Sequence, residues 1–270
     1  MAEAANEPYR PLLVDVDHWS EGAGVDTAQE LFGILDVIDA NGSLRRALTD
    51  PSHDAEARVQ LVHRLFDGRA GRVAVEITAE LVRRRAAHER QLGDGLETTA
   101  VTMAAVAAEN RGGVAGLEAL VDELIGFKTL VERSEAIQGA FADPRAGAPA
   151  KARLASRLLP QASPEGALLT QRAVSEPRGA LPGRLIERFA QVVAQRQQRW
   201  IARVTVSRPL SEEQLDKLRD GLNRLYQRDL KLAVEVDPSL IGGLRIQVGE
   251  EIIDGSVTHR LEQLQQRIAA

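Results

Sequence analysis

Apolar residues recur every three or four positions through most of the first 200 residues, and this spacing places them on one side of an α-helix. Two such stretches are Leu31, Ile34, Leu35 and Ile38, and then Leu117, Leu120, Val121, Leu124, Phe127 and Val131. Glycines interrupt the pattern at intervals that suit short helices, for example at Gly93 to Gly95 and at Gly112-Gly113. The spacing predicts a bundle of helices joined by short connections.

The chain resembles itself when it is shifted by 93 positions. Glu30-Leu31-Phe32-Gly33 then lies opposite Glu123-Leu124-Ile125-Gly126, and Ala47-Leu48-Thr49-Asp50-Pro51 lies opposite Ala140-Phe141-Ala142-Asp143-Pro144. Eleven of 36 aligned positions are identical, whereas an Ala- and Leu-rich composition gives about two to four by chance. We interpret this as a duplicated helical unit. The alternative is two similar amphipathic helix pairs without a common origin.

The periodicity changes in the run from Arg199 to Val206, which is rich in β-branched residues and predicts a strand. Ser211 and Gln214 then have the spacing of a capping box at the start of a helix. Apolar and polar residues alternate over 230–236 and again over 244–248, which predicts two half-buried strands. The chain should therefore end in a small α+β domain.

A last helix is expected after Gly255. Its apolar residues fall at steps of four, three and four, which makes a narrow seam: Val257, Leu261, Leu264 and Ile268. Such a seam suits a partner helix, and it suits equally the domain's own small sheet.

Composition argues against several classes of function. A net charge of -5 and nine aromatic residues (five Phe, two Trp and two Tyr) do not favour nucleic-acid binding. The absence of cysteine excludes disulfides, thiolate metal sites and a Cys nucleophile. The five histidines share no metal-ligand spacing, and no G-x-S-x-G or phosphate-loop motif is present. We expect no catalytic residue, metal or cofactor.

Two further segments bear on membranes. The longest weakly polar run, Thr98 to Ala108, is about half of the ~20 residues that a spanning helix needs. The N-terminus begins acidic and lacks the apolar stretch of a secretory signal. We therefore expect neither a membrane span nor a secretory signal.

The C-terminal part carries the residues that resemble a known family. They are VDPSLIGGLRIQVG from Val236 to Gly249, IIDGSV from Ile252 to Val257, and Arg260-Leu261, with Pro209-Leu210-Ser211 after the strand upstream. Together they resemble the signature of the delta subunit of F-type ATP synthase, the family of the oligomycin-sensitivity-conferring protein. Residues 1–95 have no counterpart in the short members of that family.

The repeat and the resemblance together predict a mainly α fold, with a duplicated N-terminal helical bundle followed by a small C-terminal α+β domain. Residues 1–95 would form an extra helical lobe that copies the bundle. Residues 96–199 would be the bundle that binds the catalytic head, and residues 200–270 the domain that binds the peripheral stalk.

The resemblance also implies a function without bond-making chemistry. The chain would be a non-catalytic peripheral-stalk subunit that links the head to the b-type stalk and resists rotor torque during proton-driven ATP synthesis. Its partners would be the alpha and beta subunits of the head and the b-type subunits. It would lie at the cytoplasmic face of the cell membrane, peripherally, as part of the complex.

In the family, the first and fifth helices of the bundle receive the N-terminal helix of an alpha subunit. Matched by order, these helices carry Ala100, Met103, Ala104 and Ala107, and then Leu168, Leu169 and Arg172. The resemblance favours the b-type stalk as the partner of the C-terminal seam, at Val257, Leu261, Leu264 and Ile268.

Two other classes of function compete with this interpretation. A generic helical-repeat adaptor would share the helical pattern, but it would not co-purify with ATP synthase alpha, beta and b-type chains. A hydrolase or transferase would need a polar cleft between bundle and sheet, and the isolated chain would then turn over a substrate such as a nucleotide.

Overall fold

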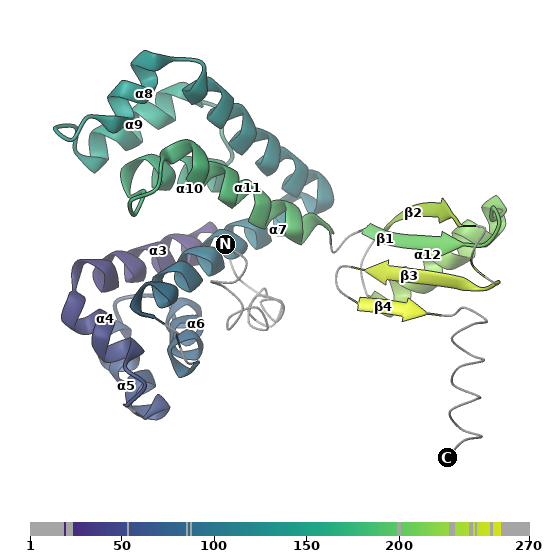
Figure 1. Ribbon diagram of the computed structural model, residues 1–270, viewed down its shortest axis with the longest axis horizontal. Coiled ribbons are helices and arrows are strands. Elements are labelled where there is room, and N and C mark those ends of the chain that lie inside the picture. Colours follow the sequence, from purple (N-terminus) through teal and green to yellow (C-terminus); the bar gives the residue numbers. More distant parts are fainter. Residues whose placement is uncertain are drawn as a thin grey trace. The chain divides into compact units, whose positions relative to one another are not determined.

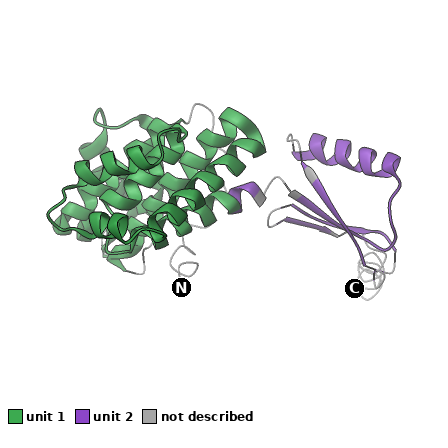
Figure 2. Cartoon of the chain, turned by 90° about the horizontal axis from the view of Figure 1, so that it is seen from above, with its two compact units in different colours: residues 1–194 green, residues 195–270 purple. Residues whose placement is uncertain are grey.

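The computed structural model describes residues 19, 24–52, 54–84, 86, 88–198, 201–226, 230–237, 240, 242–248 and 251–254. The chain divides into two compact units, Met1–Ala194 and Gln195–Ala270, which are coloured separately in Figure 2. The first unit is helical and the second contains a four-stranded sheet. This confirms the predicted fold class of a mainly helical chain that ends in a small α+β domain.

The helices of the first part of the chain follow one another with short connections (Figure 1). They are α3 (Val25–Ala40), α4 (Gly42–Thr49), α5 (Ala55–Phe66), α6 (Arg72–Arg83), α7 (Glu89–Glu132), α8 (Glu135–Ala142), α9 (Ala148–Leu158), α10 (Pro164–Ser175) and α11 (Pro182–Gln198).

The order and lengths of these helices repeat at the shift of 93 positions seen in the sequence. The shift places α4 on α8, and it brings α5 and α6 onto α9 and α10 to within one residue at each end. The packing repeats as well, because α5 contacts α6 in the first copy and α9 contacts α10 in the second. The structure therefore contains two copies of one helical unit.

The turn after the short helix has the same conformation in both copies. Asp50, at the end of α4, has φ -64° and ψ 116°, and Asp143, at the end of α8, has φ -63° and ψ 117°. Each aspartate accepts a hydrogen bond from the backbone N–H two residues later, at 2.8 Å from Ser52 and 2.9 Å from Arg145. The repeated Asp-Pro pair thus ends a helix in the same way twice.

The glutamate that begins the other repeated motif lies near the start of a helix in both copies. Glu123 accepts hydrogen bonds from the backbone N–H and hydroxyl of Ser163, the N-cap of α10, at 3.0 and 2.7 Å. In the first copy the Glu30 carboxylate lies against Gly71, the N-cap of α6. A carboxylate at a helix N-terminus is stabilised by the helix dipole. These two contacts explain why Glu30 and Glu123 match in the alignment.

Helix α7 belongs to both copies. It bends at Gly113, whose φ of 59° and ψ of -143° are not helical, and Figure 1 shows its two segments running in different directions. The segment before Gly113 corresponds to α11, and the segment after it corresponds to α3. The expected break at Gly112-Gly113 is confirmed. The one expected at Gly93 to Gly95 is wrong, because these residues lie inside the helix.

The expected boundary between residues 95 and 96 lies within the first segment of α7. The matching of helices instead divides the two copies at Gly113. Because one helix closes the first copy and opens the second, no linker separates the two. The two copies therefore form a single compact unit.

The C-terminal unit is a four-stranded sheet with one helix. Its strand order is β2-β1-β3-β4, with β1 parallel to β2 and antiparallel to β3, and β3 antiparallel to β4. The elements are β1 (Ile201–Val206), α12 (Glu212–Tyr226), β2 (Lys231–Val236), β3 (Leu244–Val248) and β4 (Glu251–Asp254). The predicted strands and the predicted helix after Ser211 are present, and the helix expected after Gly255 lies outside the described residues. Gly249 and Glu250, which follow β3 and precede β4 in the sequence, lie outside the described residues.

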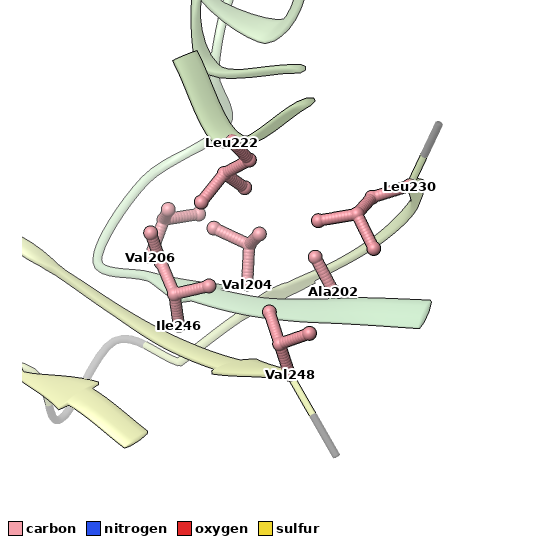
Figure 3. Close-up of a cluster of buried hydrophobic side chains, with 7 residues drawn as sticks. All are labelled: Ala202, Val204, Val206, Leu222, Leu230, Ile246 and Val248. Carbon is pink, nitrogen blue, oxygen red and sulfur yellow. The ribbon is translucent and has the colours of Figure 1, made fainter. Parts of the chain in front are cut away.

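Helix α12 covers one face of this sheet. Its Leu222 is buried with side chains of β1 and β3, such as Val204 and Ile246, as Figure 3 shows. The predicted capping box is confirmed, since Ser211 N–H donates to Gln214 at 2.9 Å and Gln214 N–H donates to Ser211 at 3.3 Å. The helix, β1 and β3 thus share one core. The expected half-burial of β2 is only partly correct, because its Val234 and Val236 are 39% and 43% exposed.

We predict that Gly113→Ala destabilises the first unit, because a side chain at this positive φ is strained by about 1–3 kcal/mol. Gly112→Ala is the matched control. Its backbone is helical and open space surrounds the added Cβ, so it should stabilise by about 0.5–1 kcal/mol. Urea unfolding followed by helix circular dichroism measures both. Equal midpoints for the two variants would contradict a bend that depends on Gly113.

A second prediction concerns the sheet unit at alkaline pH. Burial, together with the hydrogen bond that Tyr226 donates to Glu251 at 2.9 Å, raises the pKa of Tyr226 to about 12. The folded pKa lies above the ordinary value of 10.0. The phenol therefore contributes stability below pH 10, and this contribution is lost as pH rises towards 12.

Phenolate absorbance in a Tyr9→Phe background isolates Tyr226, since the chain has two tyrosines. We expect titration near pH 12, and a lower pKa in Glu251→Gln. A pKa near 10 in both would show that the hydrogen bond does not form.

Candidate functional site

The four residues expected to receive an alpha-subunit helix on α7 lie in the interior of the first unit. Ala100, Met103 and Ala104 are fully buried, and Ala107 is 7% exposed. Every residue from 99 to 108 is buried, so this segment is covered on all sides. A helix that is apolar all round belongs in a core. These residues therefore belong to the core of the unit and do not face solvent.

The three residues expected on α10 differ in exposure. Leu169 is fully buried, Leu168 is half-buried, and Arg172 is 7% exposed. Helix α10 packs against α7 and also contacts α3. The expected groove between the first segment of α7 and α10 is thus largely filled from within the chain. Contact of these residues with an alpha subunit stays a prediction.

Arg172 joins α10 to the first copy. Its Nη1 donates to both carboxylate oxygens of Asp36 on α3, at 2.6 and 2.8 Å. The guanidinium lies 4.9 Å from the centre of the Phe32 ring, and that ring lies 6.4 Å from the ring of Phe189 on α11. An ion pair, a cation–π contact and an aromatic contact thus meet at one place between the copies.

Arg178, in the connection between α10 and α11, makes a second link. Its Nε donates to Asp39 on α3 at 2.5 Å, and its Nη1 donates to Asp94 on α7 at 3.0 Å. A third carboxylate, that of Glu97, lies 3.7 Å away. The Arg178 side chain is 11% exposed, so these charges interact with little screening by water.

The backbone conformation at Arg178 and the absence of a side chain at Gly93 allow the arginine to reach its partners. Arg178 has a φ of 50°, which is uncommon for a residue other than glycine. A Cβ at Gly93 would overlap its guanidinium, so the glycine leaves the space that the side chain fills. Glu97, only 2% exposed, also accepts a hydrogen bond from Arg188 on α11. Together these residues form an ionic network between the two copies.

Periodic sequence patterns do not reveal this network. Arg178 and Asp39 are 139 positions apart, and Arg172 and Asp36 are 136 apart. Charged residues at such separations follow no period that could reveal a pair. Gly93 was the available signal, since a glycine inside a helical pattern often marks a close approach.

The residues expected to bind the stalk, Val257, Leu261, Leu264 and Ile268, lie outside the described residues. In the part of the chain that the structure describes, no group of three or more His, Asp or Glu is placed to hold a metal ion. Among those same residues, no helix is long and apolar enough to cross a membrane.

Comparison with known proteins decides the family. The model of the ATP synthase delta (OSCP) subunit matches residues 99–268. ATP synthase subunit delta of Kocuria rhizophila is 67% identical over 270 residues, which is 100% of both chains. The chain belongs to the ATP synthase delta (OSCP) subunit family. Subunit delta of an Arthrobacter species (strain FB24) is 45% identical over 274 residues, again over 100% of both chains.

These delta subunits match over their whole length, so they share the N-terminal copy as well as the second copy and the sheet unit. A chain in the solved Toxoplasma gondii mitochondrial ATP synthase hexamer also aligns, at 16% identity and a TM-score of 0.32. That alignment covers 62% of this chain and 96% of that chain. Its low TM-score supports no argument about the fold.

Membership of the delta (OSCP) family confirms the expected class of function. The chain is a structural, non-catalytic subunit of ATP synthase and part of its peripheral stalk. Such a subunit works within a complex of other subunits. Its functional sites are therefore contact surfaces.

We predict that Arg178→Met lowers the free energy of unfolding of the first unit by about 1.5–3 kcal/mol, because the partly buried Asp39 carboxylate loses its cation and Asp94 and Glu97 each lose one charged partner. Arg83→Met is the control. Arg83 also pairs with two carboxylates, Glu80 and Glu56, but it is 48% exposed, so its loss should cost about 1 kcal/mol or less. Thermal and urea unfolding compare the two. Similar losses in both variants would contradict a role for the network in joining the copies.

Proposed function

We propose that this subunit fastens the alpha and beta subunits of the catalytic head to the b-type stalk. The proposed location is the cytoplasmic face of the cell membrane. The N-terminal unit would hold the head and the C-terminal unit would hold the stalk. The chain would catalyse no reaction. It would resist the torque that the rotor applies to the head during ATP synthesis.

The observation that carries this proposal is the continuous burial of the first segment of α7. A clamp under load must not let its parts slide. Here the two helical copies share one helix, and its residues from 99 to 108 are buried in the interior of the unit. Close-packed interiors have low compressibility and transmit strain. The unit therefore has the stiffness that a static link requires.

The contact with an alpha subunit is proposed at α10. Leu168 is the partly exposed member of the predicted set, so an N-terminal alpha helix would touch it directly. The buried members, Leu169 and Arg172 on the same helix and Ala100, Met103, Ala104 and Ala107 on α7, would support that surface from below. An amphipathic helix laid on such a surface is a common mode of protein recognition.

The contact with the stalk is proposed at the seam Val257, Leu261, Leu264 and Ile268. The support comes from the sequence, since these residues recur at the spacing of a helix that packs against another helix. The family match extends to residue 268 and so includes the whole seam.

The test is purification of the tagged full-length chain from a detergent extract of membranes. Wild type should bring down alpha, beta and b-type chains together. Leu261→Asp should lose the b-type chain, because a carboxylate in an apolar helix contact is not solvated, while the unfolding temperature stays unchanged. Leu225→Asp is the control, since Leu225 in the same unit is 64% exposed and should tolerate the change.

Three results would contradict the proposal. Wild type could purify without the head and stalk chains and bring down other proteins, as an adaptor would. Leu261→Asp could keep the b-type chain, so that the seam is not the stalk contact. It could also lower the unfolding temperature markedly, which would place the seam in the core of its own domain.

A further inference from the structure

Equivalent residues of the two helical copies differ in exposure at one position. Phe32 on α3 and Ile125 on α7 are both the third residue of the repeated motif that begins Glu-Leu. Phe32 is 3% exposed, whereas Ile125 is 42% exposed. Duplication alone predicts the same environment for both residues. Side chains must therefore cover Phe32 that have no equivalent over Ile125.

The cover on Phe32 comes from the other copy. Arg172 of α10 lies over its ring and Phe189 of α11 lies beside it. Seven residues after Phe32 on α3, Asp39 accepts a hydrogen bond from Arg178, which belongs to the second copy like Arg172 and Phe189. The first copy therefore docks through an apolar side chain and a carboxylate about two helical turns apart. Its partner supplies an aromatic ring and guanidinium groups.

The other edge of the same two helices provides an internal reference. Val37 on α3 is 48% exposed and its equivalent on α7, Leu130, is 44% exposed. Neither copy covers this edge, and the two exposures agree. The difference between Phe32 and Ile125 is thus specific to the edge at which α3 docks.

The second copy keeps the chemistry of that docking edge. Val121 lies one turn before Ile125 and is half-buried. Glu132 stands seven residues after Ile125, where Asp39 stands in the first copy, and its side chain is 55% exposed. Its pairing with Lys128 at 3.3 Å is an exposed contact between neighbouring turns, which costs little to break. We call Val121, Ile125 and Glu132 the open edge of α7.

A second copy of this chain does not fit the open edge. The surface that would cover it, formed by Arg172 and Phe189, is already occupied by α3 of its own chain. The equivalents of those two residues in the first copy are Ala79 and Leu96, which are 4% and 0% exposed. Among the residues that the structure describes, neither copy therefore offers a free surface of the kind that covers Phe32.

We propose that the open edge of α7 is a docking site for an amphipathic helix of another ATP synthase subunit. That helix brings a large apolar side chain to Ile125 and a Lys or Arg to Glu132, as α10, α11 and Arg178 do for the first copy. The inference rests on the proposed function, because it takes the partner from the same complex. It adds a contact separate from α10 and from the C-terminal seam.

The test uses the absence of cysteine, since a single substitution gives a unique thiol. Ile125→Cys and Leu130→Cys are prepared in the full-length chain and labelled with a maleimide, both free and in the purified ATP synthase. Ile125→Cys should react readily in the free chain and about tenfold more slowly in the complex, because a covered site reacts only when it opens. Leu130→Cys should react at similar rates in both states.

A photoactivatable cross-linker on Ile125→Cys then identifies the partner. A cross-link to another ATP synthase subunit supports the proposal. A cross-link to a second copy of this chain, or equal labelling of Ile125→Cys in both states, overturns it. Slow labelling in the free chain also overturns it, since the chain itself would then cover the edge. If the labelled chain assembles with no head or stalk chain, the proposed function fails instead.

Discussion

The N-terminal unit depends on the burial of one helix segment between two copies of the same fold. Residues 99 to 108 of α7 carry small and apolar side chains on every side, so neighbouring helices can approach from all directions. The bend at Gly113 then lets the same helix continue as the opening helix of the second copy. The charges of Arg172 and Arg178 act at the rim of this contact, where they fix which residues of the two copies meet.

Much of the fold could be predicted from the sequence because its signals are local. The capping box at Ser211 and the shift that aligns Asp50 with Asp143 both correspond to geometry found in the structure. The contact surface could not be predicted in the same way. The resemblance places a partner contact at Ala100 and its neighbours, whereas a run without charge on any side is typical of a central, buried helix. Arg178 and Asp39 pair across 139 positions, which no periodic pattern reveals.

Duplication also changes what a helical bundle can offer to partners. One copy uses its docking edge internally, at Phe32, and the equivalent edge at Ile125 stays exposed. A head-to-tail pairing of this kind always leaves one unused edge at its end. The duplicated chain thus keeps one free docking edge, as a single bundle would, and adds an internal contact between its two copies.

The central claim is that the two copies behave as one rigid body around α7. Amide hydrogen exchange on the full-length chain tests it most directly, because amides exchange only when local structure opens. The account predicts that the amides of residues 99–108 are among the slowest in the N-terminal unit, and that α3 and α10 open together with them. Fast exchange in this segment, while α9 and α10 stay protected, would show two copies that separate readily and would contradict the account.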